Sequence, residues 1–287
     1  MKIFITGASG KIGKNLSNFL INKNYFCILN SRKKIKIEVK KKGFYNYRKD
    51  ILEKNFTIPE CEVVIHTASN TPDNNNKIAQ NQLIDKKIFS HVKKNSKIKK
   101  MIFISTVAIY NQNNKSKKVN ENSKLLSKLK YPTLKLKSEN LFLKNKKIKV
   151  YNIRVPGLLL TGKENNFISN LVEKIKNLKK FNIYNSSQLF NNLLLINSLN
   201  LFIENLIRKN FNSGNILLGS SNPLRLNKIV DIISNYFNVN SFVSWKSSKN
   251  KGFYLDIALA IKKYNFKPLS TQKSILNYLN KSYPKNV

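Results

Sequence analysis

Tyr131, Lys135 and Glu139 stand four residues apart in the stretch KYPTLKLKSE, which covers residues 130–139. On a helix this spacing places the phenol and the ammonium on one face, and Pro132 suits the first turn of such a helix. A lysine ammonium beside a phenol stabilises the phenolate, so the pair is suited to exchange a proton with an alcohol or a ketone. The same spacing also arises by chance in a lysine-rich chain, so the pair needs further support.

Thr106 supplies that support, because its hydroxyl is a suitable second donor to a substrate oxygen. It ends the apolar run MIFIST at residues 101–106 and stands 25 positions before Tyr131. Thr106, Tyr131 and Lys135 are therefore the candidate catalytic residues, and the assignment depends on finding all three together.

A glycine-rich turn near the N-terminus indicates what these residues act with. The stretch FITGASGKIGKNLSNFL sets three glycines between an apolar strand and an amphipathic helix. A phosphate cradle needs glycine for a tight turn, for close approach of the backbone to a pyrophosphate, and for close packing of the helix on the strand. The predicted contacts with a dinucleotide are Gly7, Ser9, Gly10, Lys11, Ile12 and Gly13.

Alternating elements must position these two groups of residues. Short apolar runs at 2–6, 26–30, 63–68, 101–106 and 150–155 are predicted as buried strands, and amphipathic stretches between them as helices. This alternation predicts an α/β fold with a Rossmann-type doubly wound parallel sheet. After residue 160 the strands shorten, so we predict a dinucleotide-binding domain at 1–160 and a smaller C-terminal α/β substrate domain at 161–287, with crossings back.

The composition narrows the class of protein. The 287 residues carry 53 Lys and Arg against 14 Asp and Glu, a net charge of +39. These cations are scattered along the whole chain without a nucleic-acid module, which favours a compositional origin of the charge over polyanion binding, although the charge would attract phosphates.

Cys27 and Cys61 lack metal-ligand spacing, which predicts a metal-free protein in a reducing compartment. No signal peptide or spanning segment is recognisable, so we expect a cytoplasmic protein without membrane contact.

The GxxGxxG turn, together with Thr106, Tyr131 and Lys135 in this order and spacing, resembles the extended short-chain dehydrogenase/reductase superfamily. The resemblance is to its sugar-nucleotide-modifying branch, the NAD-dependent epimerase/dehydratase family, and it covers nearly the whole chain. It implies that Asp50 and Ile51 contact the adenine, that Thr67 and Ala68 lie behind the cofactor, and that Lys135 binds the nicotinamide ribose. It also implies that His66 is a wall residue and that Asn81, 25 positions before Thr106, lies beside the active site.

The cofactor is NADP or NAD. The second predicted strand is followed by LNSRKK, without the acidic residue that usually binds the NAD ribose, and Arg32 is suited to a 2′-phosphate. This favours NADP. Substrate phosphates are expected at Arg225, and Arg154 either faces a phosphate or holds the sheet. The chain departs from the resembled family at Asn197 and Ser198, where members of that family often carry acidic residues, and this departure concerns the predicted substrate domain.

The reaction follows from the residues after Thr106. Related dehydratases carry Asp-Glu there and decarboxylases carry Glu, whereas this chain has Val107 and Ala108, which supply neither acid nor base. The expected reaction is therefore hydride exchange without elimination, by a 4-epimerase or a 4-ketoreductase acting on a nucleotide sugar. The alternatives are a reductase of a small ketone or aldehyde and a non-catalytic dinucleotide sensor. Relatives pair through the helices bearing Asn81 and Tyr131, so a homodimer is expected.

Overall fold

The computed structural model describes residues 1–38, 43–71, 77–110, 117–125, 127–162, 164–249 and 252–284. The chain divides into two compact units, each of which is discontinuous in sequence. The first unit takes Met1–Ile109, Ser127–Arg154 and Asn200–Ile216, and the second takes Tyr110–Leu126, Val155–Leu199 and Leu217–Val287. The chain therefore passes repeatedly between the units, and no single cut near residue 160 separates them.

A seven-stranded sheet is the centre of the first unit, with the strand order β12-β7-β5-β4-β1-β2-β3. The strands are β1 Lys2–Thr6, β2 Phe26–Ser31, β3 Phe44–Arg48, β4 Val63–His66, β5 Lys100–Thr106, β7 Lys149–Val155 and β12 Gly214–Leu217. The pairs β1–β2, β1–β4, β2–β3 and β4–β5 are all parallel. The order reverses at β1, and the crevice beyond the carboxyl ends of the strands at such a switch point is where ligands bind.

The predicted strands are confirmed, because each apolar run forms a strand that is buried along most of its length. Every residue of β4 is buried, and in β1 only Lys2 is exposed. Burial on both faces is typical of a parallel sheet covered by helices, which is why these strands read as continuous apolar runs. The edge strand β3 was not predicted, because its sequence FYNYR lacks a continuous apolar run. In the structure this strand is only partly buried.

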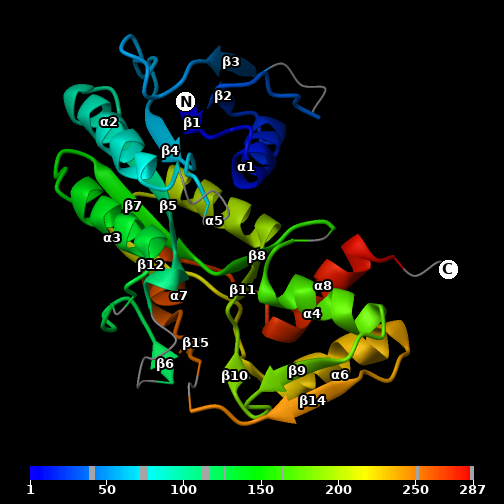
Figure 1. Ribbon diagram of the computed structural model, residues 1–287. Coiled ribbons are helices and arrows are strands. Elements are labelled where there is room, and N and C mark those ends of the chain that lie inside the picture. The colour runs from blue at the N-terminus through cyan, green and yellow to red at the C-terminus, as the bar shows by residue number, and fades with distance from the viewer. Residues whose placement is uncertain are drawn as a thin grey trace. The chain divides into compact units, whose positions relative to one another are not determined.

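Helices cover both sides of this sheet, and one of them carries an unusual buried stripe. The helices are α1 Lys11–Asn22, α2 Gln80–Lys94, α3 Lys130–Phe142 and α5 Ile196–Arg208. In Figure 1, α2 and α3 lie side by side on one side of the strands and α1 and α5 lie on the other. The buried stripe of α2 consists of Asn81, Asp85, Ile88 and Val92, so two polar side chains replace apolar ones at its N-terminal end.

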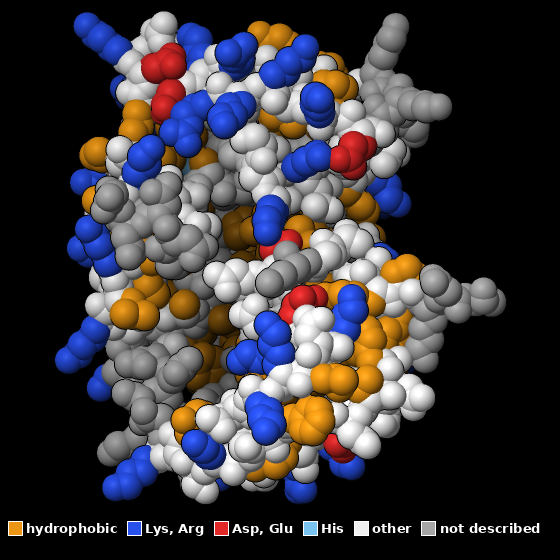
Figure 2. Space-filling model, turned by 45° about the vertical axis from the view of Figure 1, so that its right-hand side comes forward, with side chains coloured by type: hydrophobic (Ala, Val, Ile, Leu, Met, Phe, Trp, Pro, Cys, Tyr) orange, Lys and Arg blue, Asp and Glu red, His pale blue; other side chains and the backbone are white. Residues whose placement is uncertain are grey.

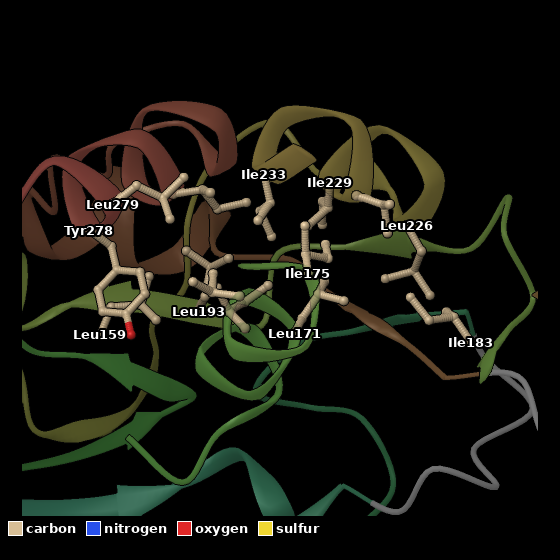
Figure 3. Packing of buried hydrophobic residues seen from close by; sticks show 14 of the residues in the cluster. Leu159, Leu171, Ile175, Ile183, Leu193, Leu226, Ile229, Ile233, Tyr278 and Leu279 are labelled. Atoms are coloured by element: carbon tan, nitrogen blue, oxygen red, sulfur yellow. The ribbon is translucent and has the colours of Figure 1, made fainter. Parts of the chain in front are cut away.

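The second unit contains four described helices and several short strands. Its helices are α4 Phe167–Lys176, α6 Leu226–Phe237, α7 Ala258–Tyr264 and α8 Thr271–Ser282. Its strands are β6 Lys118–Val119, β8 Gly157–Leu159, β9 Phe181–Tyr184, β10 Leu189–Phe190, β11 Leu193–Leu195, β13 Leu224–Arg225, β14 Val243–Lys246 and β15 Tyr254–Leu255. The strands pair as β8–β11, β9–β14, β6–β15 and β10–β13. Apolar side chains from α4, α6 and α8 meet in Figure 3, among them Leu171, Ile175, Ile229, Ile233, Tyr278 and Leu279.

The surface carries the positive charge in a dispersed form. Figure 2 shows Lys and Arg side chains scattered over the visible face of the molecule, interrupted by apolar and uncharged side chains, and acidic residues are few. No described helix is both long and apolar enough to cross a membrane.

Candidate active site

The glycine turn lies between β1 and α1, at the switch point of the sheet. Gly7 has a φ of 65°, a conformation that residues with a side chain rarely adopt. A Cβ at Gly7 would lie 2.7 Å from the Cα atom of Ala68, and one at Gly13 would lie 2.3 Å from the carbonyl oxygen of Gly7. The Gly10 N–H donates to the Gly7 carbonyl at 2.9 Å, and Gly10 directly precedes α1. Positions 7 and 13 therefore have no room for a side chain.

A cavity of about 260 Å³ opens beside this turn. It is bounded by the turn and by the segments that follow β2, β3 and β4, all at the carboxyl edge of the sheet. The predicted cofactor residues that line it are Gly7, Ser9, Gly10, Arg32, Asp50, Ile51, Thr67 and Ala68. Lys11, Ile12 and Gly13 lie in the first turn of α1 and are not part of the lining.

Asn30 stabilises the part of the cavity wall that contains Lys49 and Asp50. Asn30 stands near the end of β2, and its side-chain amide donates to the carbonyl of Lys49 at 2.9 Å and to that of Tyr47 at 3.3 Å. These bonds hold the segment after β3 against β2, which brings Lys49 and Asp50 to the same cavity as Arg32. Asp50 also accepts the Leu52 N–H through Oδ1, so it combines a turn role with its place in the cavity wall. The sequence did not single out Lys49.

Asn81 is connected to the cavity through its hydrogen bonds to Asn70. Its side-chain oxygen accepts the Asn70 N–H at 2.8 Å, and its side-chain nitrogen donates to the Asn70 carbonyl at 3.0 Å. Asn81 is buried and does not line the cavity, whereas Asn70 does. The predicted asparagine therefore lies next to this cavity and holds Asn70, which lines it.

Helix α3 presents Tyr131 and Lys135 next to β5. Pro132 lies in the first turn, where a missing N–H costs no helical hydrogen bond. The Lys135 ammonium donates to the Ile104 carbonyl at 2.9 Å and lies 4.5 Å from the ring centre of Phe103 and 5.9 Å from that of Tyr131. Lys135 is only 4% exposed, so its charge is held between aromatic rings and a main-chain carbonyl in a largely water-free place.

Thr106 is the last residue of β5, two positions beyond the carbonyl that binds Lys135. Its hydroxyl oxygen accepts the Ala108 N–H at 3.1 Å, which fixes the start of the 3₁₀ turn η2 at Val107–Ile109. Because α3 packs on β5 and on η2, the predicted catalytic residues share one small region of the first unit. Val107 and Ala108 bring no acid or base into that region.

Glu139 and Arg154 form a buried ion pair behind this region. The Arg154 guanidinium donates to both oxygens of Glu139, with an Nη2–Oε2 distance of 2.8 Å, and Ser105 donates to the same carboxylate. The side chains of Arg154 and Glu139 are 2% and 0% exposed. Of the two roles predicted for Arg154, this geometry fits the one in which it holds the sheet.

His66 lies at the end of β4, is fully buried and does not line the cavity, whereas the next two residues, Thr67 and Ala68, do. Its Nε2 lies 2.8 Å from Oδ1 of Asp85, and its Nδ1 lies 2.6 Å from the Thr6 hydroxyl. The sequence did not identify Asp85 as its partner. The available signal was an acidic side chain on the buried stripe of α2, one turn after Asn81.

A second cavity, of about 510 Å³, lies within the second unit. Arg225, predicted for substrate phosphates, lines it together with Lys117 and Lys246, and Trp245 and Tyr254 add aromatic surface. Arg225 is exposed and directly precedes helix α6. Three cations make this cavity suited to a phosphate group.

Comparisons with known proteins agree on the fold. The model of the family described as "NAD dependent epimerase/dehydratase family" matches residues 3–192. The chain is similar to the structure of UDP-glucuronic acid 4-epimerase from Bacillus cereus in complex with NAD, with a TM-score of 0.79, 19% identity, and coverage of 100% of this chain and 99% of the other. It is also similar to UDP-N-acetylglucosamine 4-epimerase from Bacillus cereus, with a TM-score of 0.75, 18% identity, and coverage of 97% and 98%.

A third similar structure is the Bordetella bronchiseptica enzyme WbmG in complex with NAD, with a TM-score of 0.77, 15% identity, and coverage of 99% of this chain and 95% of the other. At these identities the structures share a fold with this chain, which confirms the Rossmann-type prediction. No curated protein matches the chain in sequence.

Proposed function

The chain belongs to the NAD dependent epimerase/dehydratase family, and from this premise we propose that it is a nicotinamide-dependent 4-epimerase of a nucleotide sugar. One observation carries the proposal. Helix α3 holds Tyr131 and Lys135 against β5, whose last residue is Thr106, and the two residues after Thr106 supply no acid or base. That set supports proton exchange at a hydroxyl or a ketone and offers nothing for an elimination.

The glycine turn and the cavity beside it support the binding of a dinucleotide. The crowding around Gly7 and Gly13 leaves main-chain N–H groups as the surface that a pyrophosphate would meet at the start of α1. We assign the pyrophosphate to the turn from Gly7 to Ile12, the adenine to Asp50 and Ile51, and the surface behind the cofactor to Thr67 and Ala68. Lys135 is assigned to the nicotinamide ribose, and Asn81 supports these contacts through Asn70.

The protein's own residues then divide the chemistry. When bound, the nicotinamide exchanges hydride with the substrate carbon. The Tyr131 hydroxyl exchanges the proton of the reacting oxygen, and the buried Lys135 ammonium favours the phenolate that this exchange passes through. Thr106 orients the same oxygen with its hydroxyl. An epimerase needs this set to work in both directions, since the sugar is oxidised and then reduced at one carbon.

A second candidate, a 4-ketoreductase that uses NADPH, is favoured by one specific feature. Arg32 and Lys49 both line the cofactor cavity near the end of β2, where a 2′-phosphate would lie, and no acid follows β2 there. The similar structures that carry a printed cofactor carry NAD, which supports NAD and the epimerase as the first choice.

The basic cavity of the second unit supports a nucleotide-sugar substrate. Arg225, Lys117 and Lys246 would neutralise a diphosphate, and Trp245 offers a flat surface for a base. A small ketone or aldehyde carries no phosphate group that these cations could bind. The UDP-sugar epimerases among the similar structures support the same choice.

We also propose a homodimer formed through α2 and α3. Leu83 on α2 and Leu129 at the start of α3 are 57% and 71% exposed, which provides apolar surface for such a contact. Sedimentation at micromolar concentration would show a species of twice the 33.2 kDa chain mass, and a monomer would overturn this part of the proposal.

The deciding experiment identifies the cofactor and then the reaction. The purified protein is denatured, any released dinucleotide is identified, and the stripped protein is titrated with NADH and NADPH by fluorescence. Epimerisation at C4 is then followed by NMR with UDP-glucose, UDP-N-acetylglucosamine and UDP-glucuronic acid. Retained NAD and C4 exchange support the epimerase. A preference for NADPH with net reduction of a 4-keto sugar supports the ketoreductase, and binding of neither dinucleotide overturns both.

The variant Tyr131→Phe separates chemistry from binding in this experiment. It removes only the hydroxyl, so we expect turnover to fall by a factor of about 10² to 10⁴ while cofactor affinity stays unchanged. The matched control is Tyr184→Phe, which removes a hydroxyl from the surface of the second unit. Full activity of Tyr131→Phe would contradict its assignment as the proton-exchanging residue.

A further inference from the structure

A buried hydrogen-bonded network connects α2, β4 and α3 behind the cofactor cavity. At its centre is the carboxylate of Asp85, which meets Nε2 of His66 at 2.8 Å through Oδ1 and accepts the Ser138 hydroxyl through Oδ2. Asp85, His66 and Ser138 are 2%, 0% and 1% exposed. A carboxylate buried to this extent is costly unless each oxygen has a strong donor, and here each has one.

The network continues from His66 to the cavity wall. With the Nε2 hydrogen directed at Asp85, Nδ1 accepts the hydroxyl proton of Thr6 at a distance of 2.6 Å. The Thr6 oxygen in turn accepts the Ala68 N–H at 3.3 Å. Ala68 lines the cofactor cavity and contacts the glycine turn, since a Cβ on Gly7 would collide with it. The chain of bonds therefore ends at a main-chain group of the cofactor site.

The other end of the network reaches the helix that carries the proposed catalytic pair. Ser138 lies on α3 one turn after Lys135, and its hydroxyl oxygen is also 3.1 Å from the carbonyl of Leu134. The His66 ring stacks on Phe103 with a centroid distance of 5.6 Å, and the Lys135 ammonium lies 4.5 Å from the centre of that same ring. Asp85 thus bonds to His66 and to α3, and His66 stacks on the ring that lies against the Lys135 ammonium.

We propose that Asp85 is a positioning residue, which fixes the register between the cavity wall at Thr67–Ala68 and the helix that bears Lys135. The inference rests on the proposed function, because it assumes that this cavity takes a nicotinamide dinucleotide. No other acidic side chain among the described residues reaches both the wall and α3 through hydrogen bonds: Glu139 binds Arg154 and Ser105 instead. Cofactor affinity should therefore depend on Asp85, although Asp85 does not line the cavity.

The test replaces Asp85 by asparagine, which keeps the shape but turns one acceptor into a donor that faces either His66 or Ser138. We expect Asp85→Asn to weaken NADH binding by about tenfold, because the wall at Ala68 loses its fixed place. Ser138→Ala removes only one donor and should weaken binding by about twofold to fivefold. Binding is measured by NADH fluorescence, and exchange of the Ala68 amide hydrogen is measured by NMR or mass spectrometry.

A stability-matched control separates positioning from general damage. Ile229→Ala creates a hole in the core of the second unit and should lower stability without changing the affinity for NADH or the exchange of the Ala68 amide. Faster Ala68 exchange with weaker NADH binding in both network variants supports the proposal. Wild-type affinity and wild-type Ala68 exchange in Asp85→Asn and Ser138→Ala, with lowered thermal stability alone, would overturn it while leaving the proposed function intact. Failure of the unmodified protein to bind NADH or NADPH would overturn both.

Discussion

The two units of this protein bury different kinds of polar side chain. In the part of the chain that the structure describes, every buried Asp, Glu, Lys, Arg and His lies in the first unit: His66, Asp85, Lys135, Glu139 and Arg154. The buried polar side chains of the second unit are Ser, Thr and Asn, which lie around an apolar core drawn from α4, α6 and α8. Folding of the first unit therefore includes the free-energy cost of burying ionisable side chains, whereas folding of the second unit does not.

The difference follows from what each unit positions. Burying a charge is expensive unless it is paired, and a well-packed apolar pair of the same volume is often as stable or more stable. All five of these ionisable side chains lie on or next to α2, α3, β4, β5 and β7, around the proposed catalytic pair. We interpret them as the means by which α3 is held at a defined place on the sheet. In the second unit, apolar packing is sufficient to hold short strands and helices together.

The largest effect is expected where one member of a buried pair is removed. Arg154→Met leaves the Glu139 carboxylate without its bidentate partner inside the first unit. We expect a loss of about 3–5 kcal/mol in the free energy of unfolding, measured by urea denaturation. The double variant Arg154→Met with Glu139→Leu should recover most of that loss, since no uncompensated charge remains. Equal losses in the single and the double variant would contradict the view that the charge itself is what costs stability.

A somewhat smaller effect is expected in the apolar core of the second unit. Ile229→Ala removes a side chain that is fully buried between α6 and its neighbours (Figure 3) and should cost about 2–5 kcal/mol in the free energy of unfolding. The control Ile261→Ala makes the same change on α7 at a side chain that is 41% exposed, and it should cost less than about 0.5 kcal/mol. If both variants lose the same stability, burial is not what distinguishes this core.

The sequence predicts the parts of this molecule that depend on local pattern. Apolar runs located the five inner strands, and the glycine spacing located the turn after β1, because both are imposed by neighbouring residues. The spacing of Tyr131 and Lys135 predicted their common helix. Edge strand β3 lacks an apolar run, and the division into two discontinuous units depends on contacts between distant segments. Local pattern therefore predicts elements better than it predicts their assembly.

The candidate site shows the same limit at the level of single residues. Asp85 and His66 are 19 positions apart and meet only because α2 crosses behind β4. Arg154 was equally compatible with a phosphate or with the sheet until the structure placed it against Glu139. Lys49 lines the cavity beside the glycine turn because the Asn30 amide holds the segment after β3. Each of these roles depends on a pairing that spacing in the sequence does not determine.

The smallest effect is expected at the surface of the second unit, where an ion pair lies in water. Lys118 and Asp256 are 3.0 Å apart, and their side chains are 54% and 23% exposed. Partial burial alone raises the pKa of Asp256, but the hydrogen bonds from Lys118 and from the Ala258 N–H outweigh it and hold the pKa below its ordinary value. Lys118→Met makes the same cation-to-methionine change as Arg154→Met, so the two variants compare a surface pair with a buried pair directly.

The sign of the pH dependence follows from the lowered pKa. Because the folded protein binds the Asp256 proton less tightly than the unfolded chain does, the contribution of the pair is complete above the ordinary Asp range and disappears as the pH falls through the folded pKa. In Lys118→Met we therefore expect the Asp256 pKa to rise towards its ordinary value in an NMR titration. The small stability difference from wild type should vanish in acid and in high salt. An unchanged Asp256 pKa would show that the Ala258 N–H and the Lys262 charge hold it low without Lys118, and the surface pair would then contribute nothing to the second unit.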